Sequence, residues 1–231
     1  MVLTLSGCAS SKVDSSPTPT DTIGGGLSGG AVSKAEWRAT VKKVLPGIVK
    51  IDVKGCGFEA TGTGFALDNW IVTNRHVVDG AKSLSFTDSK GDKHNVVVWR
   101  YSEFDDIAIL ARTEGILPAL RLSAQDGVSG DLVATGGYPL GGPQVSNQGR
   151  LVAKSRDLVD PTSSRSFVWK TTAEVLPGDS GGPMINTAGQ VVGVVFALDL
   201  VDDYKLAIPV SRLHSLLKTP ADLTQGKPCT E

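Results

Sequence analysis

The chain has 231 residues, of which 40% are hydrophobic, and this is enough for one sizeable core or for one domain of two packed barrels. The net charge of −1 gives no sign of a nucleic-acid partner. No apolar run reaches the roughly 18 residues that a membrane span needs. The 27 glycines, together with many Val and Thr residues, favour β structure with many turns.

Residues 1–32 have the composition of a flexible tether, because Ser, Thr, Pro and Gly dominate from Ala9 to Gly30. Ahead of this stretch, Leu5-Ser6-Gly7-Cys8 resembles the bacterial lipobox, in which the cysteine is cut and acylated. We therefore expect the remnant of a lipoprotein signal, a lipid on Cys8 that anchors the chain to a membrane, and then a tether. The alternative is a disordered cytosolic tail without lipid.

The predicted elements begin at Ser33, which has capping-box spacing to Glu36 and starts a helix that runs to about Lys43. Alternating apolar and charged residues predict the first strand over 48–53. Leucines at helical spacing predict a closing helix over 211–218. A Gly-containing break at 123–131 divides the strands between these helices into two β-rich halves. The other predicted strands are 62–67, 70–73, 84–87, 95–101 and 107–112 in the first half and 132–138, 151–155, 167–171, 184–186, 190–198 and 204–208 in the second.

Ser180 lies in the segment Pro177-Gly178-Asp179-Ser180-Gly181-Gly182-Pro183. Glycines permit backbone angles that other residues avoid and let another chain approach closely. A hydroxyl on such a turn suits a nucleophile that must reach a bulky peptide. The alternative is a Gly-rich turn between two strands, since turns favour these same residue types.

The three histidines differ in context. His76 follows an apolar strand and can face a cleft as a general base, whereas a lone histidine there can also be structural. We expect His94 to lie in an exposed loop and His214 to lie on the surface of the closing helix. No His/Cys pair has the spacing of metal ligands, so we expect neither a metal nor a cofactor.

Asp106 stands at the mouth of an apolar strand, where a carboxylate needs a cationic or hydrogen-bonding partner. We expect its neighbour Asp105 to be solvated. The chain order His76, Asp106, Ser180 is that of the chymotrypsin-type triad, whereas other Ser-His-Asp enzymes use other orders. An esterase with a nucleophile elbow is disfavoured, because both partners precede the serine.

Six segments together resemble the trypsin-like serine proteases of the bacterial HtrA type. The resemblance spans about Val44 to Leu217 and implies two six-stranded antiparallel β-barrels of the chymotrypsin-like, all-β class, at about 44–122 and 130–210. The protease domain is expected over 33–218, with a tail over 219–231. The matching segments are Gly62-Thr63-Gly64-Phe65, Ile71-Val72-Thr73-Asn74-Arg75-His76-Val77-Val78, Asp106-Ile107-Ala108-Ile109-Leu110, Gly137-Tyr138-Pro139-Leu140-Gly141, Pro177 to Pro183, and Leu206-Ala207-Ile208-Pro209.

The resemblance implies a serine endopeptidase that acts through an acyl-enzyme, with catalytic His76, Asp106 and Ser180. An oxyanion hole would form from the N–H groups of Gly178 and Ser180, shaped by the Asp179 peptide. The same comparison assigns the substrate pocket to Glu174, Phe196, Ala197, Leu198 and Leu206. We expect a medium apolar P1 residue rather than a basic one, with a solvated Glu174 as the alternative to an acid in the pocket.

Cys56 and Cys229 resemble the disulfide-linked cysteines of the MarP-type periplasmic acid-resistance proteases. The resemblance implies a disulfide in an oxidising, extracytoplasmic compartment, where peptides or unfolded proteins are the substrates, in protein processing or stress response. Two free thiols in a cytosolic protein are the alternative. Asp179 raises a further question, since it can pair with a cut N-terminus, for which Ile23 begins a faint candidate, or bond to local backbone.

A rival to the enzyme is a catalytically silent domain that binds peptides or partner proteins, because a collapsed oxyanion hole leaves no trace in the sequence.

Overall fold

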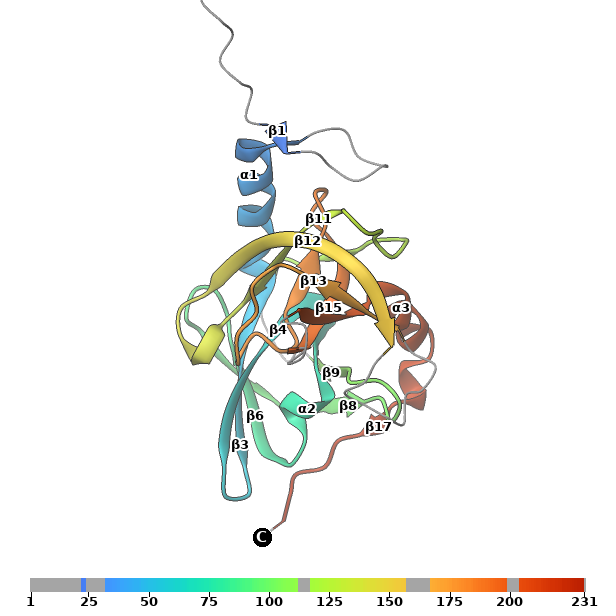
Figure 1. The fold of residues 1–231 in the computed structure, drawn as a ribbon. Helices are drawn as coiled ribbons and strands as arrows, with labels where there is room; N and C mark the ends of the chain where they lie inside the picture. The colour runs from blue at the N-terminus through green and yellow to red at the C-terminus, as the bar shows by residue number, and fades with distance from the viewer. Residues whose placement is uncertain (1–21, 24–31, 112–116, 157–166, 199–203, 231) are drawn as a thin grey trace, which may run out of the picture.

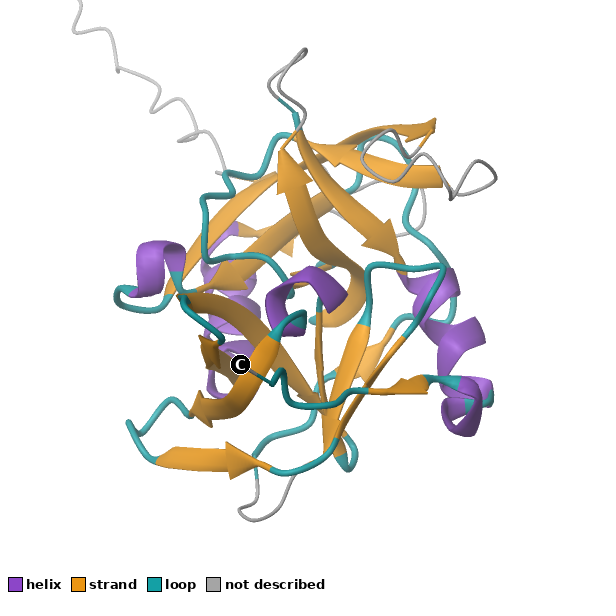
Figure 2. Cartoon of the chain, turned by 90° about the horizontal axis from the view of Figure 1, so that it is seen from below, coloured by secondary structure: helices purple, strands orange, loops and turns teal. Residues whose placement is uncertain are grey.

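The computed structural model describes residues 22–23, 32–111, 117–156, 167–198 and 204–230. It contains two large antiparallel sheets, with the second sheet above the first in Figure 1. Strands make up the body of the molecule and short helices lie around them, as the view from below in Figure 2 shows. None of the helices in the described residues is long and apolar enough to cross a membrane.

Helix α1 (Lys34–Val44) begins at the predicted cap. The Ser33 hydroxyl accepts from the Glu36 N–H at 3.2 Å, and the Glu36 carboxylate accepts from the Ser33 N–H at 3.0 Å. This reciprocal pair satisfies two N–H groups that the first turn would leave without partners. A 3-10 turn, Leu45–Gly47, which contains Pro46, follows the helix and leads into the first sheet. A short pair of strands, β1 (Thr22–Ile23) and β2 (Val32–Ser33), lies within the segment predicted to be a tether.

The first sheet contains eight strands in the order β17-β8-β9-β5-β4-β3-β6-β7. Its strand β3 alternates as predicted, with Val49, Ile51 and Val53 buried on the inner face. Helix α2 (Arg75–Val78) follows β5 and was not predicted. The strands are β3 (Ile48–Gly55), β4 (Glu59–Leu67), β5 (Trp70–Thr73), β6 (Ala81–Thr87), β7 (Lys93–Val96), β8 (Trp99–Tyr101), β9 (Ala108–Ala111) and β17 (Thr224–Gln225).

The second sheet closes on itself. Its six strands β15, β14, β11, β12, β13 and β16 form a ring because β15 pairs with both β14 and β16, and β10 adds to the outside of β15 in parallel. Helix α3 (Val210–Lys218) follows the last strand of the ring. The strands are β10 (Arg121–Leu122), β11 (Leu132–Gly137), β12 (Val145–Arg156), β13 (Phe167–Thr171), β14 (Pro183–Ile185), β15 (Gln190–Leu198) and β16 (Lys205–Pro209).

The chymotrypsin-like, mainly β architecture confirms the predicted fold class, with a closed six-stranded barrel in the second half and a curled half-barrel sheet in the first. Strands β7 and β17 end that sheet and do not pair with each other in the described residues, so it is a curled open sheet rather than a ring.

Two predicted strands differ most from the observed ones. The single strand expected at 95–101 is divided into β7 and β8, because Val97 and Val98 leave the sheet and Val97 is 71% exposed. Strand β12 begins at Val145 rather than Leu151. Its early part passes so close to the next segment that a Cβ on Gly149 would lie 2.1 Å from the backbone nitrogen of Ala173.

Three apolar clusters hold these sheets together. One lies inside the first sheet, and another, which includes Met184 and Val195, lies inside the ring of the second. The largest lies between the halves and joins Phe65 and Ile109 of the first sheet to Ile208 of the second and Trp37 of α1. Burial of this shared cluster fixes how the two halves face each other.

His94 and His214 are more buried than expected from the sequence. His94 lies in β7, stacks on Phe86 with ring centroids 4.7 Å apart, and lies 3.4 Å from a carboxylate oxygen of Asp88. His214 on α3 is half-buried and donates from Nε2 to the carbonyl oxygen of Ser123 at 2.8 Å. Both are structural contacts, made where the sequence suggested exposed positions.

Candidate active site

His76 lies in α2, directly after the buried end of β5, and its imidazole contacts Asp106. Nδ1 of His76 is 2.6 Å from Oδ2 of Asp106, and the His76 backbone N–H donates to Oδ1 at 2.8 Å. Since a carboxylate oxygen accepts, Nδ1 of His76 is the donor in this pair, and in a neutral imidazole Nε2 then carries the lone pair. The His76 side chain is 50% exposed, so this imidazole faces the surface of the molecule.

The segment that carries Asp106 is fixed from both halves of the molecule. The buried Asn74 donates from Nδ2 to the backbone carbonyl of Asp106 at 2.7 Å. The neighbouring Asp105 forms an ion pair with Arg212 of α3, which corrects the expectation that Asp105 is solvated. A helix from the second half therefore holds the loop that presents a first-half carboxylate.

Ser180 is half-buried and follows a tight turn over residues 176–179. The Asp179 N–H donates to the carbonyl oxygen of Leu176 at 3.0 Å and closes this turn. Gly178 has a φ of +100°, and a Cβ there would lie 2.6 Å from the carbonyl oxygen of Tyr138, so only glycine fits. The turn thus depends on the Gly178 that the sequence singled out.

Two backbone N–H groups of this loop have no hydrogen-bond acceptor in the part of the chain that the structure describes. Among the described residues, no acceptor pairs with the N–H of Gly178 or of Ser180, although their neighbours are bonded. Half-buried N–H groups without acceptors are suited to stabilise a negative oxygen. The Asp179 N–H, in contrast, is used within the turn and is not available to such an oxygen.

The Ser180 hydroxyl makes a long contact, 3.5 Å, with the carbonyl oxygen of Phe196. In the part of the chain that the structure describes, it forms no hydrogen bond with His76. Catalytic hydrogen bonds are often long or misaligned without substrate, so this arrangement does not exclude His76 as the base for Ser180.

Asp179 is a buried carboxylate, 5% exposed, without a cationic partner among the described residues. Its Oδ2 accepts from the Leu176 N–H at 2.9 Å, which is the local backbone contact that the sequence left as one alternative. Burial raises the pKa of Asp179 above its ordinary value, the Leu176 hydrogen bond lowers it, and the charge of Glu174 raises it further.

The predicted substrate pocket is only partly apolar. Phe196 and Leu206 are nearly buried and pack into the cluster between the halves, while the side chains of Ala197 and Leu198 lie outside those that the structure describes. Leu206 alternates along β16 with Lys205, whose Nζ lies 4.0 Å from a carboxylate oxygen of the exposed Glu174. The ammonium of Lys205, which was not predicted from the sequence, therefore lies beside the predicted pocket acid, Glu174.

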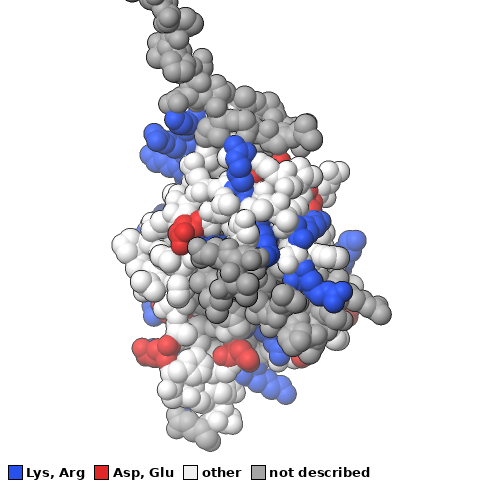
Figure 3. Space-filling model, viewed as in Figure 1, with Lys and Arg blue, Asp and Glu red and all other residues white. Residues whose placement is uncertain are grey.

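A cavity of about 440 Å³ opens beside the serine loop. One wall is formed by Leu140, Gly141, Pro177 and Gly178, and the other by the β3–β4 hairpin of the first sheet. The face drawn in Figure 3 mixes acidic and basic side chains and is mostly neither, so no single sign of charge dominates that face.

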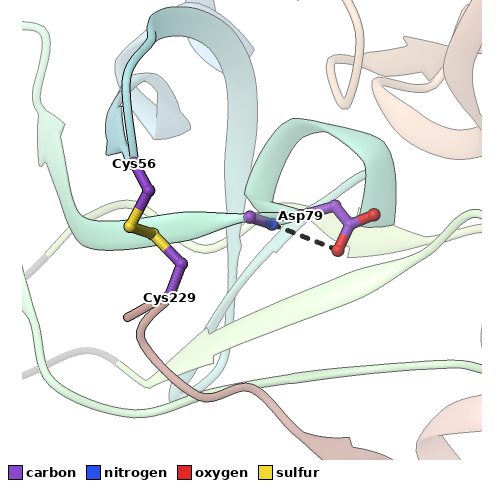
Figure 4. Close-up of a disulfide and its surroundings, with 4 residues drawn as sticks. Cys56, Asp79 and Cys229 are labelled. Carbon is purple, nitrogen blue, oxygen red and sulfur yellow. Dashed lines mark hydrogen bonds between the residues drawn. A yellow bond between two sulfur atoms is a disulfide. The ribbon is translucent and has the colours of Figure 1, made fainter. Parts of the chain in front are cut away.

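Cys56 and Cys229 form a disulfide with Cα atoms 6.2 Å apart, across a sequence separation of 173 residues (Figure 4). The tail before it runs along the first sheet, where β17 pairs with β8 and the Cys229 N–H donates to the carbonyl oxygen of Ala81 at 2.9 Å. Cys8, predicted to be lipidated, lies outside the described residues. Within those residues, no group of three or more His, Cys, Asp or Glu could hold a metal ion.

Sequence reasoning missed three residues around this site: Thr63, Leu140 and Lys205. Thr63 and Leu140 both lie in quoted motif segments, but a threonine between glycines gives no sign of its hydrogen-bond partners. Lys205 is 9% exposed, and a lysine within an apolar strand was the available signal.

The comparisons with known proteins concern the family and the fold. Residues 60–194 match the model of the trypsin-like peptidase domain. The chain is 31% identical over 186 residues to a probable periplasmic serine endoprotease, DegP-like, of Buchnera aphidicola, with 76% of this chain and 40% of that protein covered. It is 36% identical over 166 residues to the serine protease Rv3671c of Mycobacterium tuberculosis, with 68% and 41% covered. The chain thus spans less than half the length of these two relatives.

Solved structures give the same result. The active form of the Rv3671c protease superposes with a TM-score of 0.74 at 26% identity, over 96% of this chain and 97% of that one. The HtrA-type protease AlgW with a tripeptide has a TM-score of 0.73 over 80% of this chain and 64% of that one, and at 22% identity this likeness concerns the fold alone. From the family match, the similar relatives and the shared fold, we conclude that the chain belongs to the family of trypsin-like peptidase domains.

Proposed function

We propose that this protein is a serine endopeptidase in which Ser180 is the nucleophile, His76 the general base and Asp106 the group that orients His76. The observation that carries the proposal is the 2.6 Å contact between Nδ1 of His76 and Asp106, which leaves Nε2 as the base, in a chain whose Ser180 is half-buried on a tight turn. Family membership supports this assignment of roles.

The reaction follows from these groups. Ser180 Oγ attacks the carbonyl carbon of the peptide bond while His76 Nε2 takes the hydroxyl proton. Asp106 stabilises the imidazolium that forms. His76 then gives the proton to the leaving nitrogen, the C–N bond breaks, and an acyl-enzyme remains. Water, activated by His76 in the same way, attacks the ester and restores Ser180.

The free N–H groups of Gly178 and Ser180 would hold the negative oxygen of each tetrahedral intermediate. Removing one such donor costs roughly 3 kcal/mol in the transition state. The cavity beside Gly178, about 440 Å³, leaves room for the part of a peptide that extends past this site. An AlgW structure contains a bound tripeptide, which supports a peptide as the class of substrate for this chain too.

We infer a medium apolar P1 residue rather than a basic one. The Lys205 side chain is only 11% exposed, and its ammonium lies 4.0 Å from a carboxylate oxygen of Glu174, where it offsets the negative charge that would bind a basic P1 side chain. A P1 scan of peptide substrates should give the highest kcat/KM with apolar residues. Lys205→Met should then raise the relative cleavage after Lys or Arg. A wild type that already prefers Lys or Arg would contradict this specificity.

The proposed compartment is extracytoplasmic, with a role in protein processing or stress response. A relative is named periplasmic, and a disulfide persists in oxidising surroundings. We further propose a lipid on Cys8 as the anchor. Intact-mass spectrometry of the mature protein would find the mass of the acyl groups at Cys8, and an unmodified cysteine would contradict the anchor.

Peptide hydrolysis by wild type and by Ser180→Ala tests the enzyme directly. We expect Ser180→Ala to reduce hydrolysis to the background rate without changing the circular dichroism spectrum. Ser83→Ala, an exposed serine on β6, is the matched control and should keep full activity. Substantial hydrolysis by Ser180→Ala would contradict the assignment.

A second candidate function is a catalytically silent peptide-binding domain. The observation that favours it is the Ser180 hydroxyl, which contacts the Phe196 carbonyl rather than His76. A wild type that binds peptides but hydrolyses none of them would support this function over the endopeptidase.

A further inference from the structure

Thr63 joins the half of the molecule that carries His76 to the loop that carries Ser180. It lies on β4 and is fully buried. Its backbone N–H donates to the carbonyl oxygen of Ser180 at 2.8 Å, and its hydroxyl donates to the carbonyl oxygen of Gly178 at 2.7 Å. One side chain and its own backbone thus bind the serine loop at two points.

The direction of the hydroxyl bond is fixed. The N–H of Tyr138 donates to Oγ1 of Thr63 at 3.0 Å, so Oγ1 accepts there and must use its single proton toward Gly178. The result is a short chain of hydrogen bonds that runs from Tyr138 of the second half, through Thr63 of the first, to the Gly178 carbonyl. Such chains strengthen each member by polarisation.

This contact bears on the free N–H groups through peptide geometry. In a trans peptide the C=O and the N–H point to opposite sides of the chain. The peptide that Thr63 holds, between Gly178 and Asp179, lies between the two peptides whose N–H groups are free. Its own N–H is used within the turn to Leu176. Rotation of this middle peptide changes ψ of Gly178 and φ of Asp179, the two backbone angles through which it is joined to those neighbouring peptides.

The first of those neighbours is held in a similar way. The Leu140 N–H donates to the carbonyl oxygen of Pro177 at 2.6 Å, which turns the Gly178 N–H to the opposite side. Leu140 itself has a φ of +54°, an unusual conformation for a residue with a branched side chain. The serine loop is therefore set by contacts from outside it as well as by its own sequence.

We propose that Thr63 is a positioning residue of the oxyanion site, whose hydroxyl holds the peptide between Gly178 and Asp179 so that the Gly178 and Ser180 N–H groups address one oxygen. The inference rests on the proposed endopeptidase function. It differs from a purely structural role because removal of the hydroxyl should weaken stabilisation of the transition state more than binding of the substrate.

Thr63→Val removes the hydroxyl at nearly constant shape, and Thr63→Ser retains it. With a peptide that the wild type cleaves, we expect Thr63→Val to lower kcat about tenfold to a hundredfold with little change in KM. Thr63→Ser should stay within about threefold of the wild-type kcat. A peptide boronate, which forms a tetrahedral adduct on the serine, should lose affinity for Thr63→Val by a similar factor, whereas a product peptide should bind both proteins equally.

Thr171→Val is the matched control. Thr171 is also fully buried, and its hydroxyl likewise accepts from one N–H, of Ala173 at 3.1 Å, and donates to one carbonyl, of Arg150 at 3.0 Å. We expect Thr171→Val to lower the melting temperature as much as Thr63→Val does but to leave kcat and boronate affinity near the wild-type values.

If Thr63→Val does not fold, Thr63→Cys carries the test, because a thiol fills the same space and is a weaker donor; its kcat should lie below that of Thr63→Ser. A Thr63→Val or Thr63→Cys protein with the wild-type kcat and boronate affinity would overturn the inference alone. An equal loss of kcat in Thr171→Val would also overturn it. A wild type without hydrolysis would overturn the endopeptidase and the role of Thr63 together.

Discussion

The second sheet closes into a ring through its own strands, whereas the first ends in strands that do not pair with each other in the described residues. In place of ring closure, the first sheet carries the C-terminal tail, which adds β17 to β8 and ends in the disulfide between Cys56 and Cys229. The loop with the proposed nucleophile, Ser180, comes from the self-closed sheet, whereas His76 and Asp106 come from the open one. The proposed catalytic geometry therefore depends on the contacts that hold the open half in place.

The largest effect on stability is expected from removal of the disulfide. Replacing both Cys56 and Cys229 by Ser should lower the free energy of unfolding by about 3–5 kcal/mol, because closing so long a loop removes conformational entropy from the unfolded chain. Guanidinium unfolding measures this loss. Hydrogen exchange should show that β3, β6 and β8 lose protection before the strands of the ring. A loss below about 1 kcal/mol, or equal loss of protection in both sheets, would contradict the comparison.

The next effect concerns the ion pair between Asp105 and Arg212, which ties the loop of the first half to α3 of the second. Asp105→Ala should destabilise the protein by about 2 kcal/mol, since the side chains are only 23% and 14% exposed. Asp52→Ala is the control, because its partner Lys93 is 57% exposed, and it should cost below about 1 kcal/mol. Equal losses of unfolding free energy for the two variants, measured in urea, would show that the ion pair between the halves contributes no more than an exposed one.

A smaller effect is expected at the start of α1, whose Trp37 packs into the cluster between the halves. Ser33→Ala removes the capping hydroxyl and should cost about 1 kcal/mol in thermal unfolding. Ser215→Ala, on the exposed side of α3, should stay within about 0.5 kcal/mol of the wild type. An unchanged stability of Ser33→Ala in thermal unfolding would mean that α1 is stabilised by packing alone.

The smallest effect is a pH dependence at Asp179. Because burial raises its pKa in the folded protein, the folded state binds more protons here than the unfolded state between the ordinary and the raised pKa. The stability that comes from this extra proton on Asp179 is therefore lost as the pH rises from the ordinary pKa through the raised pKa. Asp179→Asn should match the wild type below the ordinary Asp pKa and be more stable than it at neutral pH. A variant that is less stable than the wild type at pH 7 would contradict the sign.

Much of the fold could be predicted because local sequence patterns determine where the helices and strands begin and end. The capping box gave the start of α1, and short runs of strand-forming residues between turn signals gave strands such as β5 and β13 to the residue. The open edge of the first sheet could not be predicted, because ring closure depends on pairing between distant strands. The early part of β12 was missed because its polar residues and Gly149 have low strand propensity, and close backbone approach decides the structure there.

For the site, sequence order brought His76, Asp106 and Ser180 forward as candidates, and the structure adds what a motif does not contain. The pairing of Asp105 with Arg212 spans 107 positions, and the contact of Thr63 with Gly178 spans 115. Contacts at such separation leave no periodic signal in one sequence. The surroundings of Glu174 were the least predictable. Lys205 is recognisable as a lysine within an apolar strand, but its contact with Glu174 becomes visible only when β16 is placed beside that residue.

The most direct test of the central claim is the reaction of the protein with a fluorophosphonate probe, followed by intact-mass and peptide mass spectrometry. We expect one adduct per chain, located on Ser180, and much slower labelling of His76→Ala because that variant lacks the proposed base. A wild-type protein that stays unlabelled, or that carries the adduct on another residue, would contradict the claim that Ser180 is a nucleophile activated by His76.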